Sequence, residues 1–304
     1  MILRLAGVRS SCARPAALTT AMLLGFAISL SSAPVPLGIF SFKRDGQLMM
    51  VEARLDQSAP AWFVVDSGAS HTVFDPKFAN ELGLELTSAP PTTGTGTGEV
   101  PKSHTRPVVM TLGEVKVDLP EPWVIDLSKA PLPPAVRGLV GAELFKTFVV
   151  RMDPTKSTLT VFAPATYRHE GEGASIPLLV EGDKLFLEAT LEVPAGQTVT
   201  HKLRIDTGSE SSVNDGVVQK SAELRTSILG GGLGEQFKSY SGVFTSVKIG
   251  PYAIKHVWGP GGPRPSIGME LLRRFVITFD APHGRMYLEP TPALADPVPT
   301  PPPN

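Results

Sequence analysis

Short apolar runs alternate with turn-forming residues along most of this sequence. The runs are rich in Val, Ile, Leu and Phe and are bounded by Gly, Pro, Asp or Asn, a pattern typical of β-strands joined by turns. Two segments, 142–147 and 269–274, instead have the character of short helices. The predicted fold class is therefore all-β, with strands at 47–55, 62–65, 108–112, 148–152, 158–162, 185–191, 202–205, 243–249, 276–279 and 285–288.

The same order of landmarks occurs twice along the chain. Four residues return 136 positions later, so that Gly46, Glu52, Ala53 and Leu55 correspond to Gly182, Glu188, Ala189 and Leu191. A repeat of this length predicts two similar domains that pack as a pseudo-dimer. We place the first domain at 38–165, a polar linker at 167–173, the second domain at 174–291 and a Pro-rich, disordered tail at 292–304.

Each repeat contains an apolar segment that runs into an Asp, a small hydroxyl residue and a Gly. One such tripeptide is weak evidence, because Asp and Gly are ordinary turn residues. Two copies in equivalent places predict that each half contributes one carboxylate to a shared site. The copies are Asp66-Ser67-Gly68 and Asp206-Thr207-Gly208, and a second repeated element, ending in glycine, follows as Leu139-Val140-Gly141 and Ile267-Gly268.

These motifs resemble those of the aspartic peptidases. The single-copy form is similar to retropepsin-like proteases, and this chain resembles a fused, two-repeat bacterial form, a pseudo-dimer in the manner of pepsin. The resemblance implies two β-barrel halves related by a pseudo-two-fold axis, with a short helix in each half. It also implies that Asp66 and Asp206 are the catalytic residues and that the two glycine elements support their loops from behind. A Gly-rich loop at 94–98 follows the first motif, and it lacks the tyrosine that pepsin-type enzymes carry in their corresponding loop.

Two neighbouring carboxylates suit the hydrolysis of a peptide bond. They cannot both ionise cheaply, so they share one proton, and one acts as base on a water molecule while the other acts as acid. We expect Gly68 and Gly208 to allow close approach of the loops. Ser67 and Thr207 are expected to form hydrogen bonds across the seam between the halves.

The residues after the two motifs differ. Ala69 follows the first motif where Ser209 follows the second. A hydroxyl group at that place can donate to the adjacent carboxylate and favour its charged form. The sequence therefore predicts Asp206 as the better ionised member, with Ser209 as its donor.

Two Gly-rich loops lie at similar distances after the motifs. One interpretation is mobile backbone that covers an extended peptide substrate and pairs with it. The other is a pair of ordinary hairpin tips, and both interpretations stay open. The loops contain Gly94, Gly96 and Gly98 in the first half and Gly231, Gly232 and Gly234 in the second.

Composition and charge indicate which kinds of binding partner are not expected. The chain has 304 residues, 42% of them hydrophobic, and a net charge of -1, which gives no electrostatic footprint for nucleic acid. Its six histidines are scattered, so we expect no metal site, and no motif requires a cofactor. We expect His71 to be a local or exposed residue. Trp123 and Trp258 are expected to pack in the core, with the lining of pockets as the alternative.

The first 33 residues have the features of an export signal. Arginines at positions 4, 9 and 14 precede a largely apolar stretch at 16–30, and small residues at 31–33 offer cleavage points. The prediction is export to the periplasm or outside the cell, with an uncleaved membrane anchor as the alternative. Cys12, the single cysteine, precedes the apolar stretch and is badly placed for lipid attachment.

The sequence thus favours an exported aspartic endopeptidase that acts on peptides or proteins in extended conformation. Both halves are present in one chain, so a monomer is expected to be catalytically competent. A non-catalytic peptide-binding protein on the same fold is the alternative. A glycosidase is a third class, but its chemistry gives no reason for a duplicated Asp-Ser/Thr-Gly motif.

Overall fold

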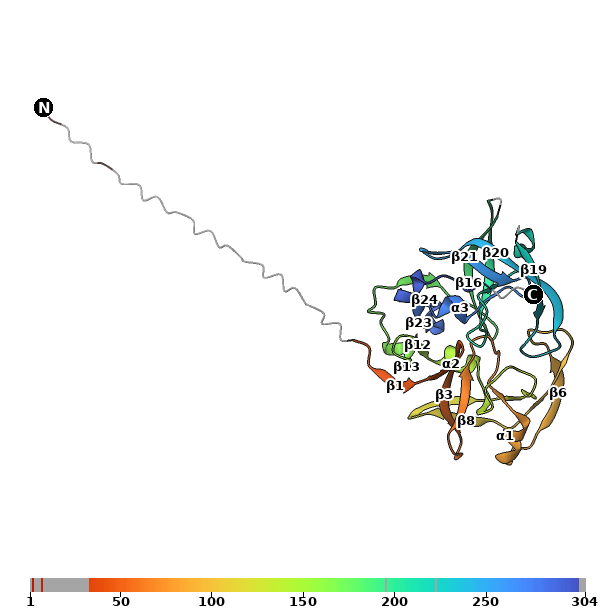
Figure 1. Cartoon of the computed structure of the whole chain (residues 1–304). Coiled ribbons are helices and arrows are strands. Elements are labelled where there is room, and N and C mark those ends of the chain that lie inside the picture. The colour runs from red at the N-terminus through yellow and green to blue at the C-terminus, as the bar shows by residue number, and fades with distance from the viewer. Residues whose placement is uncertain (1, 3–6, 8–32, 195, 222, 301–304) are drawn as a thin grey trace. The chain divides into compact units, whose positions relative to one another are not determined.

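Antiparallel strands make up most of the computed structural model, which describes residues 2, 7, 33–194, 196–221 and 223–300. Most of the predicted export signal, 1–33, lies outside the described residues. Among those that are described, no helix is long and apolar enough to cross a membrane. The described residues from 33 to 300 belong to one compact unit, in which strands of the first repeat and strands of the second occupy opposite sides (Figure 1).

The first repeat forms a ten-stranded sheet around the strand that leads into Asp66. That strand, β4 (Ala61–Val65), pairs in parallel with β11 (Val136–Val140) and antiparallel with β3 (Leu48–Leu55). The order across the sheet is β6 (Thr87–Thr92), β7 (Val100–His104), β10 (Trp123–Val124), β5 (Val73–Phe74), β11, β4, β3, β8 (Val108–Leu112) and β9 (Val115–Leu119), with β2 (Lys43–Asp45) on β3.

The second repeat forms an eight-stranded sheet with the same central arrangement. Its β17 (Gln197–Ile205) leads into Asp206 and pairs in parallel with β22 (Ser266–Ile267) and antiparallel with β16 (Lys184–Val193). The order is β18 (Val213–Asn214), β22, β17, β16, β20 (Phe237–Ile249) and β19 (Leu224–Leu229), with β15 (Leu179–Glu181) on β16 and β21 (Tyr252–Pro260) on β20.

A six-stranded sheet joins the two repeats. Three strands come from each side, and β12 pairs antiparallel with β23 at the middle, where Arg151 is opposite Thr278. The order is β1 (Pro36–Ser41), β13 (Thr158–Phe162), β12 (Val149–Asp153), β23 (Phe275–Asp280), β24 (Arg285–Pro290) and β14 (Ala174–Pro177). The prediction of an all-β fold built from curled half-barrel sheets is confirmed.

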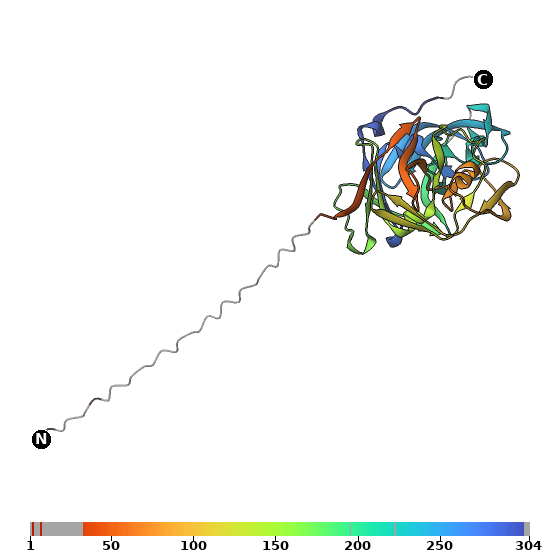
Figure 2. The same ribbon diagram turned by 90° about the horizontal axis from the view of Figure 1, so that it is seen from below.

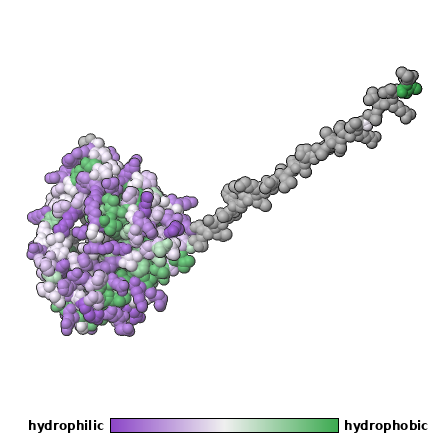
Figure 3. All heavy atoms as spheres, turned by 180° about the vertical axis from the view of Figure 1, so that it is seen from behind, coloured by the Kyte–Doolittle hydropathy of each residue, from purple (hydrophilic) through white to green (hydrophobic). Residues whose placement is uncertain are grey.

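Buried and exposed side chains alternate along the strands, and the buried ones form the core. In β16 every second side chain is buried and the others are half-buried or exposed, as expected for a strand with one face in the interior. Each large aliphatic side chain buried in this way contributes about 1.5–3 kcal/mol through the hydrophobic effect. The face seen in Figure 3 is mainly hydrophilic with separate apolar patches. Val35, Leu37 and Ile39 are exposed apolar residues at the edge strand β1.

The short helices differ slightly from the sequence prediction. Helix α2 (Ala142–Thr147) has the predicted bounds, whereas α3 (Met269–Leu272) ends before Arg274 because the amide of Arg274 bonds to the Leu271 carbonyl in a tighter i→i+3 turn. Helix α1 (Pro76–Glu81) was not predicted. Asp75 begins it, since its side chain accepts a hydrogen bond from the amide of Lys77.

The C-terminal segment is packed against the body, which differs from the predicted disordered tail. A 3₁₀ turn, η4, covers Pro292–Ala295, and Val298 is buried. The fully buried Arg274 donates hydrogen bonds to the carbonyl oxygens of Ala293, Asp296 and Pro297. A buried guanidinium needs such acceptors, and this requirement outweighs the Pro-rich composition. Figure 2 shows the segment, dark blue, along the outside of the body, and residues 301–304 lie outside the described part.

Candidate active site

The two Asp motifs follow directly on equivalent strand ends. Asp66 comes after β4, and its amide donates to the carbonyl oxygen of Val140 at 2.9 Å. Asp206 comes after β17, and its amide donates to the carbonyl oxygen of Ile267, also at 2.9 Å. The second repeated element thus lies beside the first in both halves and fixes the backbone of each Asp.

Ser67 and Thr207 connect the two motif loops by four buried hydrogen bonds. The Thr207 hydroxyl accepts from the Ser67 amide at 2.9 Å and donates to the Val65 carbonyl at 2.8 Å. The Ser67 hydroxyl accepts from the Thr207 amide at 3.1 Å and donates to the Ile205 carbonyl at 2.9 Å. Each hydroxyl group therefore both donates to and accepts from the backbone of the opposite half. These bonds fix the position of one loop relative to the other.

The motif glycines place the two carboxyl groups side by side. A β-carbon added at Gly208 would lie 2.4 Å from the Cγ atom of Asp66. One added at Gly68 would lie 2.6 Å from the Cγ atom of Asp206. Each glycine therefore touches the carboxyl group of the other half, and any side chain would force the loops apart. We call Asp66 and Asp206 the Asp pair.

Asp66 holds its proton to an unusually high pH for an aspartate. Its pKa is raised from an ordinary 3.8 to about 7, first because burial penalises the charged form and second because Asp206 lies close by. Hydrogen bonding to the Gly68 amide, 2.8 Å from Oδ1, and the charge of Arg204 oppose this rise.

Arg204 belongs to the site and was not predicted. Its Nη2 atom donates to Oδ2 of Asp206 at 2.7 Å, and both side chains are largely buried. Ser209 was the predicted donor, but its hydroxyl is bonded to that of Ser211 at 2.8 Å. An Arg two residues before an Asp at the end of a strand is a usable sequence signal, because side chains two apart point to the same face.

The glycine-ending elements lie behind the motif loops. A β-carbon at Gly141 would come 2.4 Å from the backbone of His71, and one at Gly268 would come 2.4 Å from the carbonyl oxygen of Ser211. Leu139 and Val140 belong to β11, and Ile267 belongs to β22. The predicted residues of these elements are thus brought next to the loops that carry the Asp pair.

The two Gly-rich loops meet each other. They are hairpin tips, between β6 and β7 and between β19 and β20, and they form an antiparallel bridge between Thr97 and Glu235 with two hydrogen bonds of 2.9 Å. The Gly96 amide also donates to the carbonyl oxygen of Leu233 at 2.8 Å, and Arg264 bonds to that of Gly94. Gly98, Gly231, Gly232 and Gly234 lie in the same two tips.

Aromatic residues near the first motif are stacked. His71 lies on Trp123 with 4.1 Å between ring centroids, and Lys102 places its Nζ atom 3.5 Å from the centroid of Trp123. In the second half Arg225 lies over the ring of Trp258 at 4.6 Å. Among the described residues there is no group of three or more His, Cys, Asp or Glu side chains placed to hold a metal ion.

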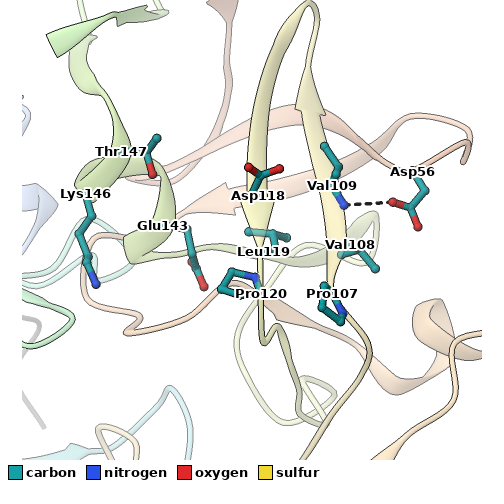
Figure 4. A pocket seen from close by; sticks show the side chains of 10 residues that line it. All are labelled: Asp56, Pro107, Val108, Val109, Asp118, Leu119, Pro120, Glu143, Lys146 and Thr147. Carbon is teal, nitrogen blue, oxygen red and sulfur yellow. Dashed lines mark hydrogen bonds between the residues drawn. The ribbon is translucent and has the colours of Figure 1, made fainter. Parts of the chain in front are cut away.

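A separate cavity of about 560 Å³ lies between α2 and the β8–β9 hairpin. In Figure 4, Glu143 and Lys146 of α2 lie on one side of the cavity and Asp118 of β9 on the other, and Asp56 accepts from the amide of Val109. None of the residues that line it belongs to the Asp-pair loops.

Comparison with known families agrees with the geometry of the first half. Residues 51–144 match a family model described as aspartyl protease. The matched part contains the first Asp motif and the first glycine element, and the second repeat lies outside it. No curated protein matches the chain. The match supports an aspartyl protease and hence a peptidase in general, which implies peptide substrates.

Proposed function

We propose that this chain is an aspartic endopeptidase in which a water molecule between Asp66 and Asp206 attacks the peptide bond. The observation that carries the proposal is the reciprocal contact of the motif loops, in which each glycine lies against the opposite carboxyl group. Two carboxyl groups from the two halves are thereby in reach of one bound molecule. The family match over residues 51–144 supports the same reaction class.

The proposed reaction uses the Asp pair with one proton. Asp206, ionised, takes a proton from the water as its oxygen attacks the carbonyl carbon, while Asp66 donates its proton to the carbonyl oxygen. The tetrahedral intermediate then collapses. Asp206 delivers its proton to the leaving nitrogen, the C–N bond breaks, and the hydroxyl proton of the intermediate returns to Asp66. The original protonation state is restored, and the products are a carboxylic acid and an amine.

We further propose that the substrate is an extended peptide covered by the two Gly-rich loops. Each loop carries backbone donors and acceptors at a hairpin tip, which are groups that can pair with an added strand. Both carboxyl groups come from one chain, so the proposal requires no second copy for catalysis. The basic and apolar start of the sequence supports export to the periplasm or the exterior.

The proposal is tested with the variants Asp66→Asn and Asp206→Asn on an unfolded protein substrate. Either change removes one of the two proton-transfer groups, so we expect cleavage to fall by at least about 100-fold. Asp118→Asn changes an exposed side chain of strand β9 away from the Asp pair, and this matched control should cleave at the native rate. Fragments are counted by mass spectrometry between pH 4 and pH 8. Full activity in Asp206→Asn, or peptide binding without turnover by the native protein, would refute the peptidase assignment.

A further inference from the structure

We propose that Arg204 fixes the roles within the Asp pair, because its ion pair holds Asp206 as the ionised base and leaves the proton on Asp66. This inference rests on the proposed peptidase function and adds a positioning residue that the motifs do not contain. Arg204 is expected to act through Asp206 and not by touching the substrate.

The backbone of β17 orients the Arg204 side chain toward Asp206. Arg204 is paired with Phe186 on one side and Ser266 on the other, and its amide donates to the carbonyl oxygen of Pro265 at 3.0 Å. Pairing on both sides keeps the backbone extended at Arg204. Side chains two positions apart in an extended strand lie on the same face, so those of Arg204 and Asp206 share one face. The resulting Nη2–Oδ2 distance of 2.7 Å is that of a charge-assisted hydrogen bond.

The first half has no counterpart to this arginine. Val64 stands two residues before Asp66, and it is fully buried in an apolar cluster with Met50 and Leu139. Asp66 accepts instead from the neutral amide of Gly68. One carboxyl group is thus stabilised by a full positive charge and the other by a peptide dipole, although the tripeptide motifs are nearly identical. This asymmetry selects Asp206 as the anion.

The charges around Asp206 are few. Asp66 faces it from the first half and Arg204 faces it from its own strand. Glu210, next in the second loop, accepts a hydrogen bond from the amide of Gln47 at 2.7 Å. With one proton on the Asp pair, Arg204, Asp206 and Asp66 together are electrically neutral. A neutral buried cluster avoids most of the desolvation penalty that an uncompensated charge would carry.

The charge of Arg204 should affect the pH dependence of cleavage. Arginine keeps its charge over the whole working range. Replacing it by a neutral residue makes the ionised Asp pair less stable and removes one influence that lowers the pKa of Asp66. In Arg204→Gln we therefore expect both limbs of the profile of kcat/KM against pH to move upward by roughly one unit or more. Arg204→Lys retains a charge and should keep the limbs near their native positions.

The outcomes separate this inference from the proposed function. If Asp66→Asn and Asp206→Asn abolish cleavage while Arg204→Gln keeps the native pH profile, the peptidase stands and the role of Arg204 is refuted. If the Asp variants keep their activity, the peptidase assignment itself fails.

A second measurement needs neither activity nor an Arg204 variant. Carboxyl NMR of the folded protein, labelled with ¹³C in its aspartate side chains, should show one signal that titrates near neutral pH. We expect Asp66→Asn to remove that signal. Its loss in Asp206→Asn instead, with the signal retained in Asp66→Asn, would overturn the assignment of roles.

Discussion

At the scale of single residues, the carboxyl group of Asp66 connects the proposed catalysis with stability. An aspartate in the unfolded chain loses its proton near the ordinary pKa of 3.8, whereas Asp66 in the folded protein does so at about 7. Between these two values the folded state binds more protons than the unfolded state. The free energy of unfolding therefore decreases as the pH rises through this window, and the contribution of Asp66 is complete only below about pH 4.

Replacing Asp66 by Asn should remove this pH-dependent loss. We expect Asp66→Asn to be more stable than the native protein at pH 8, by on the order of 2 kcal/mol, because a neutral amide avoids the penalty that an ionised carboxylate has for burial beside Asp206. At pH 4 the two proteins should unfold at nearly the same temperature. Calorimetry at both pH values measures the difference, with Asp118→Asn as the control. An equal gain at both pH values would show that titration of Asp66 is not the cause.

The sequence predicted the symmetric part of the site and missed the asymmetric part. The repeated tripeptides located Asp66 and Asp206, and the hydroxyl groups of Ser67 and Thr207 were expected to bond across the seam, as they do. A repeat cannot reveal a residue that occurs in one copy only, and Arg204 is such a residue. The hydroxyl of Ser209 is chemically able to donate to Asp206, but in the folded loop it is bonded to the hydroxyl of Ser211. This partner depends on the conformation of the loop, which the sequence does not show.

At the scale of elements, the two Gly-rich loops depend on the absence of side chains where they touch. A β-carbon at Gly94 would lie 2.2 Å from the carbonyl oxygen of Leu233. One at Gly231 would have open space around it, and Gly231 is not among the glycines with positive φ. The same substitution is therefore forbidden at one tip and tolerated at the other, which offers a matched pair of variants.

We expect Gly94→Ala to separate the loops and Gly231→Ala to leave them together. The added methyl group must displace the backbone near Leu233, so the hydrogen bonds between Thr97 and Glu235 should open. Hydrogen exchange at these two amides measures the effect, and exchange should become at least about tenfold faster in Gly94→Ala. If Gly94→Ala protects both amides as well as the native protein does, the loops are not held by this contact.

Element prediction succeeded where a segment carried its own signal. Strands 108–112 and 158–162 have the predicted bounds, because each is a short run rich in apolar residues that turns enclose. The two-residue strands β5 and β10 are too short for any periodicity and exist only through pairing with neighbours distant in sequence. The signal for α1 was present, with Asp75 before Pro76, but six residues are too few for a helical repeat. Helix α2 has the same length and was predicted from its place after the repeated glycine element.

At the scale of the whole molecule, the six-stranded sheet and the C-terminal segment hold the repeats as one body. Arg151 on β12 makes two hydrogen bonds to Glu289 on β24, so an ion pair crosses the boundary between the repeats. Burial of this arginine is partial, and its pKa is raised chiefly by the hydrogen bonds to Glu289. The relative position of the two Asp loops is thus supported by the shared sheet as well as by their own contacts.

The C-terminal segment completes the second repeat, which leads to a test by truncation. Removing residues 292–304 takes away the carbonyl acceptors of Arg274 at Ala293, Asp296 and Pro297 and leaves part of a buried guanidinium unpaired. Because an unsatisfied buried donor of a charged group is costly, we expect the free energy of unfolding to fall by roughly 2–4 kcal/mol. Removing only 301–304 is the control and should change little. Urea unfolding of both truncated chains measures the difference, and equal stability would mean that Arg274 finds other acceptors and that the segment does not stabilise the fold.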